Sequence, residues 1–300
     1  MLRFLLLSLG AAYAINPALA CNMSADDRSS QLAAFVENGW ACLENLPDTF
    51  RFDAEAEQQF EREVNKERER AGLKRLKIRN ETRDAARFHS LDMGVNEFFS
   101  HTSPGGLSHD ERIAAFDRTL ISDRSAENVA QFGPAVCTDQ DDKVVSCLLL
   151  PGFELPTRNE VVEHLHKELM LSDGHRENIL DPDVTHMSVG VARTDTGFYV
   201  TQLFVSVAGT VEDPLPLQFD AGDRITANAE IGDEWDSQRF AVAMAEETQD
   251  LASGKLPDDV SGDMQVYIRA ERVEEDQNRK TRYWIYLSGP TISVRSPTES

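Results

Sequence analysis

The sequence predicts an α+β fold, and three features of it support that prediction. Segments with apolar residues at helical spacing fill much of residues 54–171. Two alternating segments, 188–192 and 198–205, flank a short polar turn and predict a β-hairpin. Beyond residue 211, short strand-like segments follow one another between acidic and glycine-containing turns. The 300 residues leave room for one domain of about 150 residues and a smaller unit.

Residues 1–20 have the organisation of a signal peptide. Arg3 precedes an apolar run, and Ala18-Leu19-Ala20 fits a small-x-small cleavage site. The run is too short for a membrane span, and no later segment is long and apolar enough for one. We expect a mature chain that begins near Cys21, is secreted or periplasmic, and has no transmembrane segment.

Four cysteines remain after cleavage, and in an exported chain they predict two disulfides with three possible pairings. Proximity favours Cys21–Cys42 and Cys137–Cys147. A cysteine at the cleavage point also suggests an alternative, in which Cys21 anchors the chain as a lipoprotein. That anchoring is not favoured, because Ala18 and Leu19 stand in the reverse of the usual order and lipidation would leave Cys42 unpaired. The spacing does not resemble a zinc-binding cysteine pair.

The chain is acidic, with 30 Lys and Arg against 52 Asp and Glu and a formal net charge of −22. Such a charge disfavours nucleic acid and anionic membrane surfaces as partners, because phosphate binding needs a basic face. It favours cations.

Helices and one loop are expected in order along the first 171 residues. A helix over 29–46 belongs to an N-terminal helical extension, residues 21–53. Further helices are expected over 54–71, 80–95, from 110 to 116, and over 159–171. The turn-rich loop after residue 100 contains His101. In the stretch 172–182, Gly174 is expected to turn the chain sharply beside His175, and Pro182 discourages a helix from continuing.

The C-terminal third is expected to be a small β-rich module, residues 211–300. Residues 211–216 predict a linker. The strands are expected at 224–231, 239–245, 265–272 and 283–287. Trp235, Tyr267 and Trp284 are interpreted as core residues of this module rather than as a ligand platform.

Five stretches in the middle of the chain carry a family resemblance. They are Ala86–Met93, Phe98–Pro104, Ala126–Ala130, Ser172–Pro182, and the hairpin segments Val189–Ala192 and Tyr199–Phe204. In this order and at these spacings they resemble the CAP superfamily of SCP-like extracellular proteins in its bacterial form. The resemblance covers about residues 55–208, and it implies an α-β-α sandwich for a domain over 54–210.

The resemblance also implies a cleft that is lined by two histidines and at least one glutamate. His101 and His175 match the two imidazoles, and Glu127 matches the first glutamate. The position of the second glutamate stays open, since one alignment gives Glu168 and another gives none. His89 is interpreted as structural. His166 and His186 are expected on the surface.

Two imidazoles and a carboxylate can hold a divalent cation, so His101, His175 and Glu127 are the candidate metal ligands. Zinc is expected ahead of calcium or magnesium. With an open coordination position the ion could activate water, and without an ion the same groups could do acid–base work near neutral pH. Ser103 and Ser172 lie near histidines in sequence, but no nucleophile-elbow pattern supports a serine hydrolase.

The predicted function is therefore that of an exported CAP-domain binding or interaction protein. Family members are better described as extracellular binding modules than as enzymes, and some bind lipids or sterols. The expected partner is a small apolar or lipid ligand, or a cell-envelope component. The alternative is a metal-dependent hydrolase that acts on peptide or cell-envelope substrates.

Overall fold

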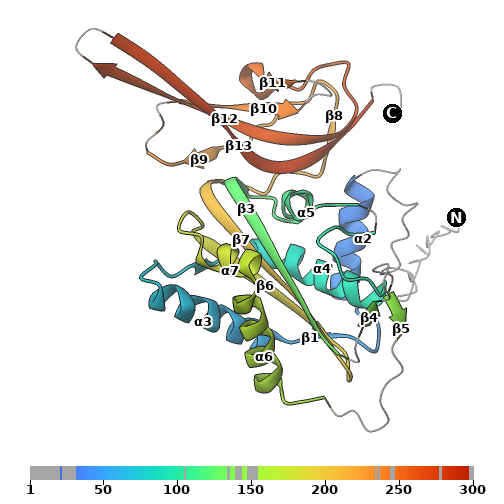
Figure 1. The fold of residues 1–300 in the computed structure, drawn as a ribbon. Coiled ribbons are helices and arrows are strands. Elements are labelled where there is room, and N and C mark those ends of the chain that lie inside the picture. Colours follow the sequence, from blue (N-terminus) through green and yellow to red (C-terminus); the bar gives the residue numbers. More distant parts are fainter. Residues whose placement is uncertain are drawn as a thin grey trace, which may run out of the picture.

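The computed structural model describes residues 21, 32–104, 106–133, 136–138, 144–146, 155–233, 235, 237–243, 247–276 and 279–296 (Figure 1). The predicted signal peptide and the Cys137–Cys147 pairing lie outside this part of the chain. Within it, no helix is both long enough and apolar enough to cross a membrane.

The helices are α2 (Leu32–Glu44), α3 (Ala54–Arg70), α4 (Arg83–Val95), α5 (His109–Phe116), α6 (Arg158–Leu171) and α7 (Asp173–Leu180), with short 3-10 turns at Asn80–Thr82 and Ala252–Gly254. The strands up to the hairpin are β1 (Arg51–Phe52), β2 (Lys77–Ile78), β3 (Leu120–Phe132), β4 (Val136–Thr138), β5 (Val144–Ser146), β6 (His186–Arg193) and β7 (Phe198–Val211). Those beyond it are β8 (Gln218–Asp220), β9 (Ala229–Ile231), β10 (Ser237–Ala243), β11 (Thr248–Asp250), β12 (Gly262–Asp276) and β13 (Arg279–Arg295).

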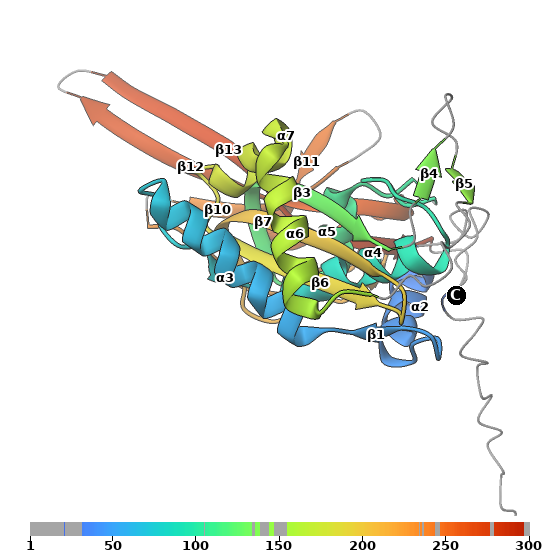
Figure 2. The same ribbon diagram turned by 60° about the horizontal axis from the view of Figure 1, so that its bottom comes forward.

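The α+β prediction is confirmed, and the hairpin β6–β7 lies at the centre of an antiparallel sheet in the order β1-β6-β7-β3. Helices α3, α6 and α7 cover one face of this sheet, and α2, α4 and α5 cover the other (Figures 1 and 2). The predicted α-β-α sandwich is thereby confirmed.

Alternation along the hairpin explains why both faces carry helices. Met187, Val189 and Val191 of β6 point into the core under α3 and α6. On the adjacent strand, Leu203 and Val205 point to the opposite face, under α2, α4 and α5. Since side chains of a strand alternate between faces, a strand that is apolar on both sides must be covered twice.

Helix α4 lies unusually close to the sheet, and Gly190 on β6 permits it. A Cβ atom built on Gly190 would lie 2.3 Å from the backbone carbon of Ala86. The Ser90 hydroxyl donates a hydrogen bond of 2.9 Å to the Gly190 carbonyl. A residue without a side chain is required where two backbones approach in this way.

The stretch 172–182 corrects one prediction. Instead of turning sharply at Gly174, it forms helix α7, with Gly174 inside its first turn. Ser172 is extended (ψ 124°) and separates α6 from α7, so the chain changes direction one residue before the helix rather than within it. Asp181 is again extended, as expected for the residue before Pro182.

The Cys21–Cys42 pairing is confirmed, with a Cα–Cα distance of 5.1 Å. Both cysteines are buried in a small cluster with Leu91 and Ala192. The disulfide therefore holds Cys21 against α2, beside Leu91 and Ala192.

The C-terminal strands bury a core of their own and continue the hydrogen-bonded sheet. One residue pair, Ser122–Ser288, joins β3 to β13, and β9 pairs with the end of β7. Of the predicted strand 224–231, only Ala229–Ile231 is a strand. The hairpin β12–β13 extends beyond the body of the molecule (Figures 1 and 2).

The aromatic residues of the C-terminal strands differ in their placement. Trp235 packs against the C-terminal core, in agreement with its predicted role. Trp284 lies on the extending hairpin and is 54% exposed, so the prediction of a core role for it was wrong. The Arg269 guanidinium lies 5.6 Å from the centroid of its ring.

Arg118 connects the C-terminal strands to the sandwich. Its buried guanidinium donates to carbonyl oxygens at the end of α5, at Leu215 and Pro216, and at Thr291 of β13. Burial lowers the pKa of this guanidinium to about 10. One side chain therefore serves three segments that are distant in sequence.

Candidate functional site

The site is built around Glu127, a buried carboxylate in the middle of β3. One oxygen, Oε2, accepts a hydrogen bond of 2.5 Å from Arg112 Nη2. The other, Oε1, lies 3.0 Å from His101 Nδ1, which donates to it. This contact leaves His101 Nε2 directed away from the carboxylate, because the two ring nitrogens lie on opposite sides of the imidazole.

Arg112 of α5 holds both the carboxylate and the loop that carries His101. It is almost fully buried and also donates to the carbonyl oxygens of His101 (3.1 Å) and Leu107 (2.7 Å). Arg112 was not predicted from the sequence as a site residue. A signal was available, since it lies three and four residues before Ala115 and Phe116, which share the buried face of α5.

Glu127 is ionised at neutral pH. Burial alone would raise its pKa, but the hydrogen bond from His101 and the charge of Arg112 outweigh burial and lower the pKa. A buried carboxylate with two charged or polar partners avoids the cost of an unpaired charge.

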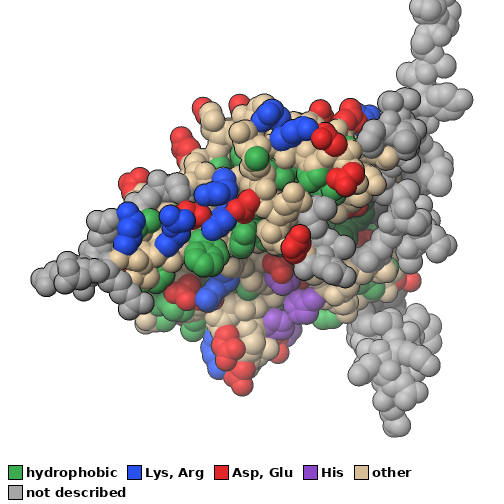
Figure 3. All heavy atoms as spheres, turned by 90° about the horizontal axis from the view of Figure 1, so that it is seen from above, with side chains coloured by type: hydrophobic (Ala, Val, Ile, Leu, Met, Phe, Trp, Pro, Cys, Tyr) green, Lys and Arg blue, Asp and Glu red, His purple; other side chains and the backbone are tan. Residues whose placement is uncertain are grey.

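His175 of α7 faces His101, with ring centroids 6.4 Å apart. The side chain of His101 is 54% exposed, whereas His175 is half-buried and its Nδ1 has no hydrogen-bond partner among the described residues. Burial, and then the charge on His101, lower the pKa of His175. The His175 imidazole is therefore neutral at pH 7. Exposed histidine side chains gather in one patch on the face drawn in Figure 3.

Two asparagines fix α7 against β3. Asn128 Nδ2 donates to the His175 carbonyl at 3.1 Å. Asn178 Nδ2 donates to the Glu127 carbonyl at 3.1 Å and to Asn128 Oδ1 at 2.9 Å. Neither role was predicted from the sequence, although both asparagines lie in stretches that carry the family resemblance. Together they set the separation between Glu127 and His175.

His89 lies under the site and is fully buried. Its Nε2 donates to the Ser100 carbonyl at 2.9 Å and lies 3.9 Å from Glu127 Oε1. Burial, followed by the nearby charge of Arg112, lowers the pKa of His89 to about 3. The residue is therefore a neutral part of the core, as the sequence indicated.

Glu168 is not brought into this group. Its side chain is exposed on α6, and within the described part of the chain no hydrogen bond or ion pair joins it to His101, Glu127 or His175.

His166, on the same helix, is buried, with neither ring nitrogen partnered among the described residues. The surface placement expected for His166 was wrong. It lies between Val162 and Leu169 at helical spacing, so it shares their buried face. His186 is half-buried.

The arrangement fits a cation less well than the sequence suggested. Both oxygens of Glu127 are engaged, and the Arg112 guanidinium beside it repels positive charge. No cluster of three or more His, Cys, Asp or Glu side chains that could hold a metal ion occurs among the described residues. Two imidazoles on one tetrahedral zinc ion have ring centroids about 5 Å apart, so the 6.4 Å separation of His101 and His175 is wider than a two-histidine zinc site requires. In such a site, Glu127 would be the carboxylate that orients one ligand.

Comparisons with known proteins agree on the middle of the chain. Residues 61–207 match the model of the Cysteine-rich secretory protein family, abbreviated CAP. The uncharacterized protein YkwD of Bacillus subtilis (strain 168) is 32% identical over 143 residues, which are 47% of this chain and 44% of that protein. This chain therefore spans less than half the length of that curated relative.

Two solved structures are similar to parts of this chain. An extracellular protein containing a SCP domain from Bacillus anthracis str. Ames is 26% identical, with a TM-score of 0.36, over 50% of this chain and 40% of that one. An outer surface protein from Borrelia burgdorferi is 18% identical, with a TM-score of 0.38, over 52% of this chain and 98% of that one. Both TM-scores are too low to support an argument about the site.

Proposed function

This chain belongs, through residues 61–207, to the Cysteine-rich secretory protein family, and from that premise we propose that it is an exported binding protein whose ligand contacts the imidazoles of His101 and His175. Export is supported by the signal-like residues 1–20 and by the Cys21–Cys42 disulfide, which persists in oxidising compartments.

The observation that carries the proposal is the fixed orientation of His101. A buried, ionised carboxylate accepts its Nδ1–H, and Arg112 holds that carboxylate and the His101 carbonyl at once. An exposed side chain would otherwise sample several rotamers, at a cost in entropy when a ligand binds. Preorganisation of an exposed imidazole favours a binding role.

The imidazole pair offers nitrogen lone pairs, which accept hydrogen bonds or bind a borderline cation. Zinc is expected ahead of calcium and magnesium, because the latter prefer oxygen ligands. His101 Nε2 and one nitrogen of His175 would hold the ion, and a bound ion would lower the pKa of a water in its open positions. The chain itself supplies the orientation of His101 and the neutrality of His175.

The surface beside α7 favours a polar ligand over a lipid. A hollow of about 440 Å³ lies at the C-terminal end of α7. Its lining includes five charged side chains, namely Arg124, Arg176, Glu177, Asp181 and Asp183. Burying a lipid chain against these groups would cost their hydration. A cell-envelope component with polar groups is therefore the expected partner class.

One observation favours the alternative of a hydrolase, namely that a carboxylate-oriented histidine is the geometry of a general base. The hydroxyl of Ser103, two residues after His101, is buried beside Arg112 and unsuited to attack. The hydrolase alternative therefore uses water as the nucleophile rather than Ser103.

Calorimetric titration of the full mature chain with zinc, calcium and magnesium tests whether the imidazoles of His101 and His175 are available to bind a ligand. We expect one zinc ion per chain, lost in the His101→Ala/His175→Ala double variant. His164→Ala, which removes an exposed histidine of α6 outside the site, is the matched control and should bind zinc unchanged. Zinc binding that survives the double variant, or no zinc binding by the parent chain, would overturn the proposal. Turnover of peptide or envelope substrates that depends on His101 would favour the hydrolase instead.

A further inference from the structure

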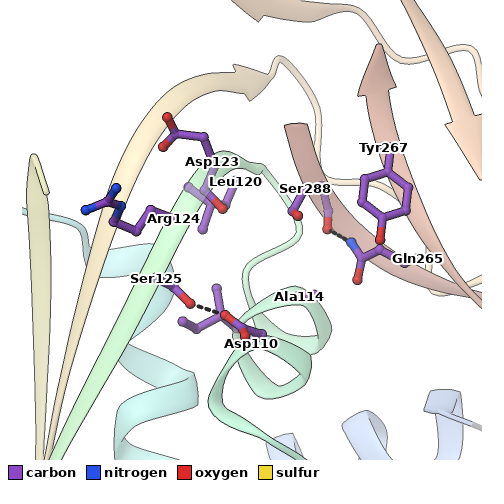
Figure 4. Close-up of a pocket in the computed structure, with 12 residues that line it drawn as sticks. Asp110, Ala114, Leu120, Asp123, Arg124, Ser125, Gln265, Tyr267 and Ser288 are labelled. Atoms are coloured by element: carbon purple, nitrogen blue, oxygen red, sulfur yellow. Dashed lines mark hydrogen bonds between the residues drawn. The ribbon is translucent and has the colours of Figure 1, made fainter. Parts of the chain in front are cut away.

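A second candidate site lies where the sandwich meets the C-terminal strands. A cavity of about 410 Å³ lies there between β3 on one side, β12 and β13 on the other, and α5 below (Figure 4). Its volume is in the range of small-molecule sites in proteins, about 300–1,000 Å³. Neither His101 nor His175 lines it.

Irregular strand pairing opens this cavity. In β3, Ser122 and Arg124 pair with consecutive residues of β7, so Asp123 has no partner there. In β13, Gly289 and Pro290 together lie opposite the single residue Val266 of β12. Bulges bend strands and redirect side chains, and they occur often beside functional sites. Here two bulges, one in each part of the molecule, border the same space.

Three hydroxyl groups border the cavity without hydrogen-bond partners among the described residues. They belong to Ser122 of β3, Tyr267 of β12 and Ser288 of β13. By contrast, Gln265 is fixed in place, since its amide donates to the Val266 and Gly289 carbonyls and accepts from Thr291. Free hydroxyls on three strands can each donate and accept, which matches a ligand that is itself rich in hydroxyl groups.

The charges at the cavity exclude an anionic ligand. Asp110 and Asp123 are its two carboxylates. Among the described lining residues the only cation is Arg124, which is paired with Asp181 at 2.9 Å and Asp183 at 3.2 Å. Figure 4 shows Asp123 and Arg124 directed away from the wall formed by β12 and β13. No free positive charge in the described lining is left for a phosphate or carboxylate.

The remaining surface is apolar and suited to the flat face of a sugar ring. Ile113, Ala114 and Leu120 form a small apolar patch, and Asp110 lies three and four residues before the first two on the same face of α5. Tyr267 adds an aromatic ring on the opposite wall. Sugar rings present aliphatic C–H groups on their faces and hydroxyls at their edges, so they need both kinds of surface.

We propose that this junction cavity binds a neutral saccharide of one or two rings. The Asp110 carboxylate, which already accepts from Ser125, and the three free hydroxyls hydrogen-bond the sugar edge, while Tyr267 and the apolar patch contact its face. The inference is independent of the His101–His175 proposal, because neither histidine lines the junction cavity.

The test is calorimetry and NMR titration of the full mature chain with cellobiose and N,N′-diacetylchitobiose as neutral probes. Glucosamine and glucuronic acid are the cationic and anionic comparisons. Tyr267→Phe and Ser288→Ala each remove one hydroxyl with little change in volume, and each should weaken binding of a neutral probe about fivefold. Tyr283→Phe is the matched control, since Tyr283 is an exposed tyrosine of β13 outside the cavity. It should bind like the parent chain.

Three outcomes would overturn the proposal. The first is no saturable binding of either neutral probe at millimolar concentration. The second is binding that Tyr267→Phe and Ser288→Ala leave unchanged. The third is stronger binding of glucuronic acid than of the neutral probes. Thermal unfolding of each variant establishes that a loss of binding is not a loss of fold, and the His101→Ala/His175→Ala variant should retain saccharide binding.

Discussion

The sandwich and the C-terminal strands use charge in different ways. In the sandwich, ion pairs such as Arg112–Glu127 and Arg79–Asp117 are buried, with side chains at most 8% exposed. Among the C-terminal strands, the pair Arg295–Asp220 is exposed, with side chains that are 52% and 59% exposed. Buried pairs gain little net stability over apolar residues, but they are costly to break. Exposed pairs contribute little in either direction.

The difference indicates which substitutions each region can tolerate without a large loss of stability. Arg112 and Glu127 fix the loop that carries His101, so the sandwich uses buried charge to hold a geometry. The extending hairpin β12–β13 instead exposes aromatic rings, including Trp284. Substitutions at such exposed positions should therefore affect stability less than substitutions at the buried pairs of the sandwich.

The largest effect is expected for Arg112→Met. It leaves the Glu127 carboxylate buried without its cation, and it should lower the free energy of unfolding by about 3–5 kcal/mol. Urea denaturation measures this change. Adding Glu127→Gln should restore part of the loss, because the second substitution removes the unpaired charge. Arg295→Met, at an exposed pair, should change the free energy by less than about 1 kcal/mol. Equal losses in the two single variants would remove the contrast between the regions.

Gly190→Ala should have the next largest effect. The new Cβ would lie 2.3 Å from the Ala86 backbone, so α4 must move off the sheet, at a cost of about 1–3 kcal/mol. Gly289→Ala in β13 is the matched comparison, since its nearest contact is the Val266 carbonyl at 3.2 Å. Thermal unfolding should give a smaller decrease for Gly289→Ala. The reverse order would contradict the close packing of α4.

The pH dependence of stability should have a component that His89→Gln removes. The folded-state pKa of His89 is about 3, below its ordinary value of 6.5, so the unfolded chain binds more protons between these values. Stability therefore falls as pH falls through this window, by about 1.4 kcal/mol per pH unit for one such group. Urea denaturation from pH 7 to pH 4 should give a shallower slope for His89→Gln than for the parent chain. Identical slopes would indicate that His89 is protonated in the folded state.

The smallest effect is expected for Trp284→Ser. Its ring is more than half exposed and contacts Arg269 at the surface, so unfolding free energy should change by no more than about 0.5–1 kcal/mol. Phe204→Ala, at a fully buried ring of β7, should by contrast cost about 3–5 kcal/mol. A large loss for Trp284→Ser would mean that the extending hairpin is covered in solution.

The elements that sequence predicted well are those with a strong period. In helices α3, α4 and α6 and in the hairpin β6–β7, the apolar residues recur at a spacing that places them on a buried face in only one type of secondary structure. Helix α7 was missed because Gly174 and Pro182 are typical turn residues, and only Ser172 marks the helix start.

The site was predicted only in part for a similar reason. His101, Glu127 and His175 lie in distinctive local stretches, whereas Arg112 acts from a helix that the local stretches do not include. A buried arginine is rare, so composition gives no reason to expect one there. The hydrogen bonds from Arg112 to His101 and Glu127 depend on the tertiary approach of α5 to β3, which a single sequence does not specify.

Arg118 has a consequence for how the chain is made. Its guanidinium needs the Thr291 carbonyl, 173 residues further along, and Leu32 at the start of α2 donates to Asp263, 231 residues away. A ribosome that adds about 5–20 residues per second takes roughly 10–35 s to reach Thr291 from Arg118. During that time this buried cation lacks its partner in β13. We therefore expect the new chain to complete its packing only once β13 has been synthesised, and an N-terminal fragment that stops before β8 should be recognised by chaperones as unfinished.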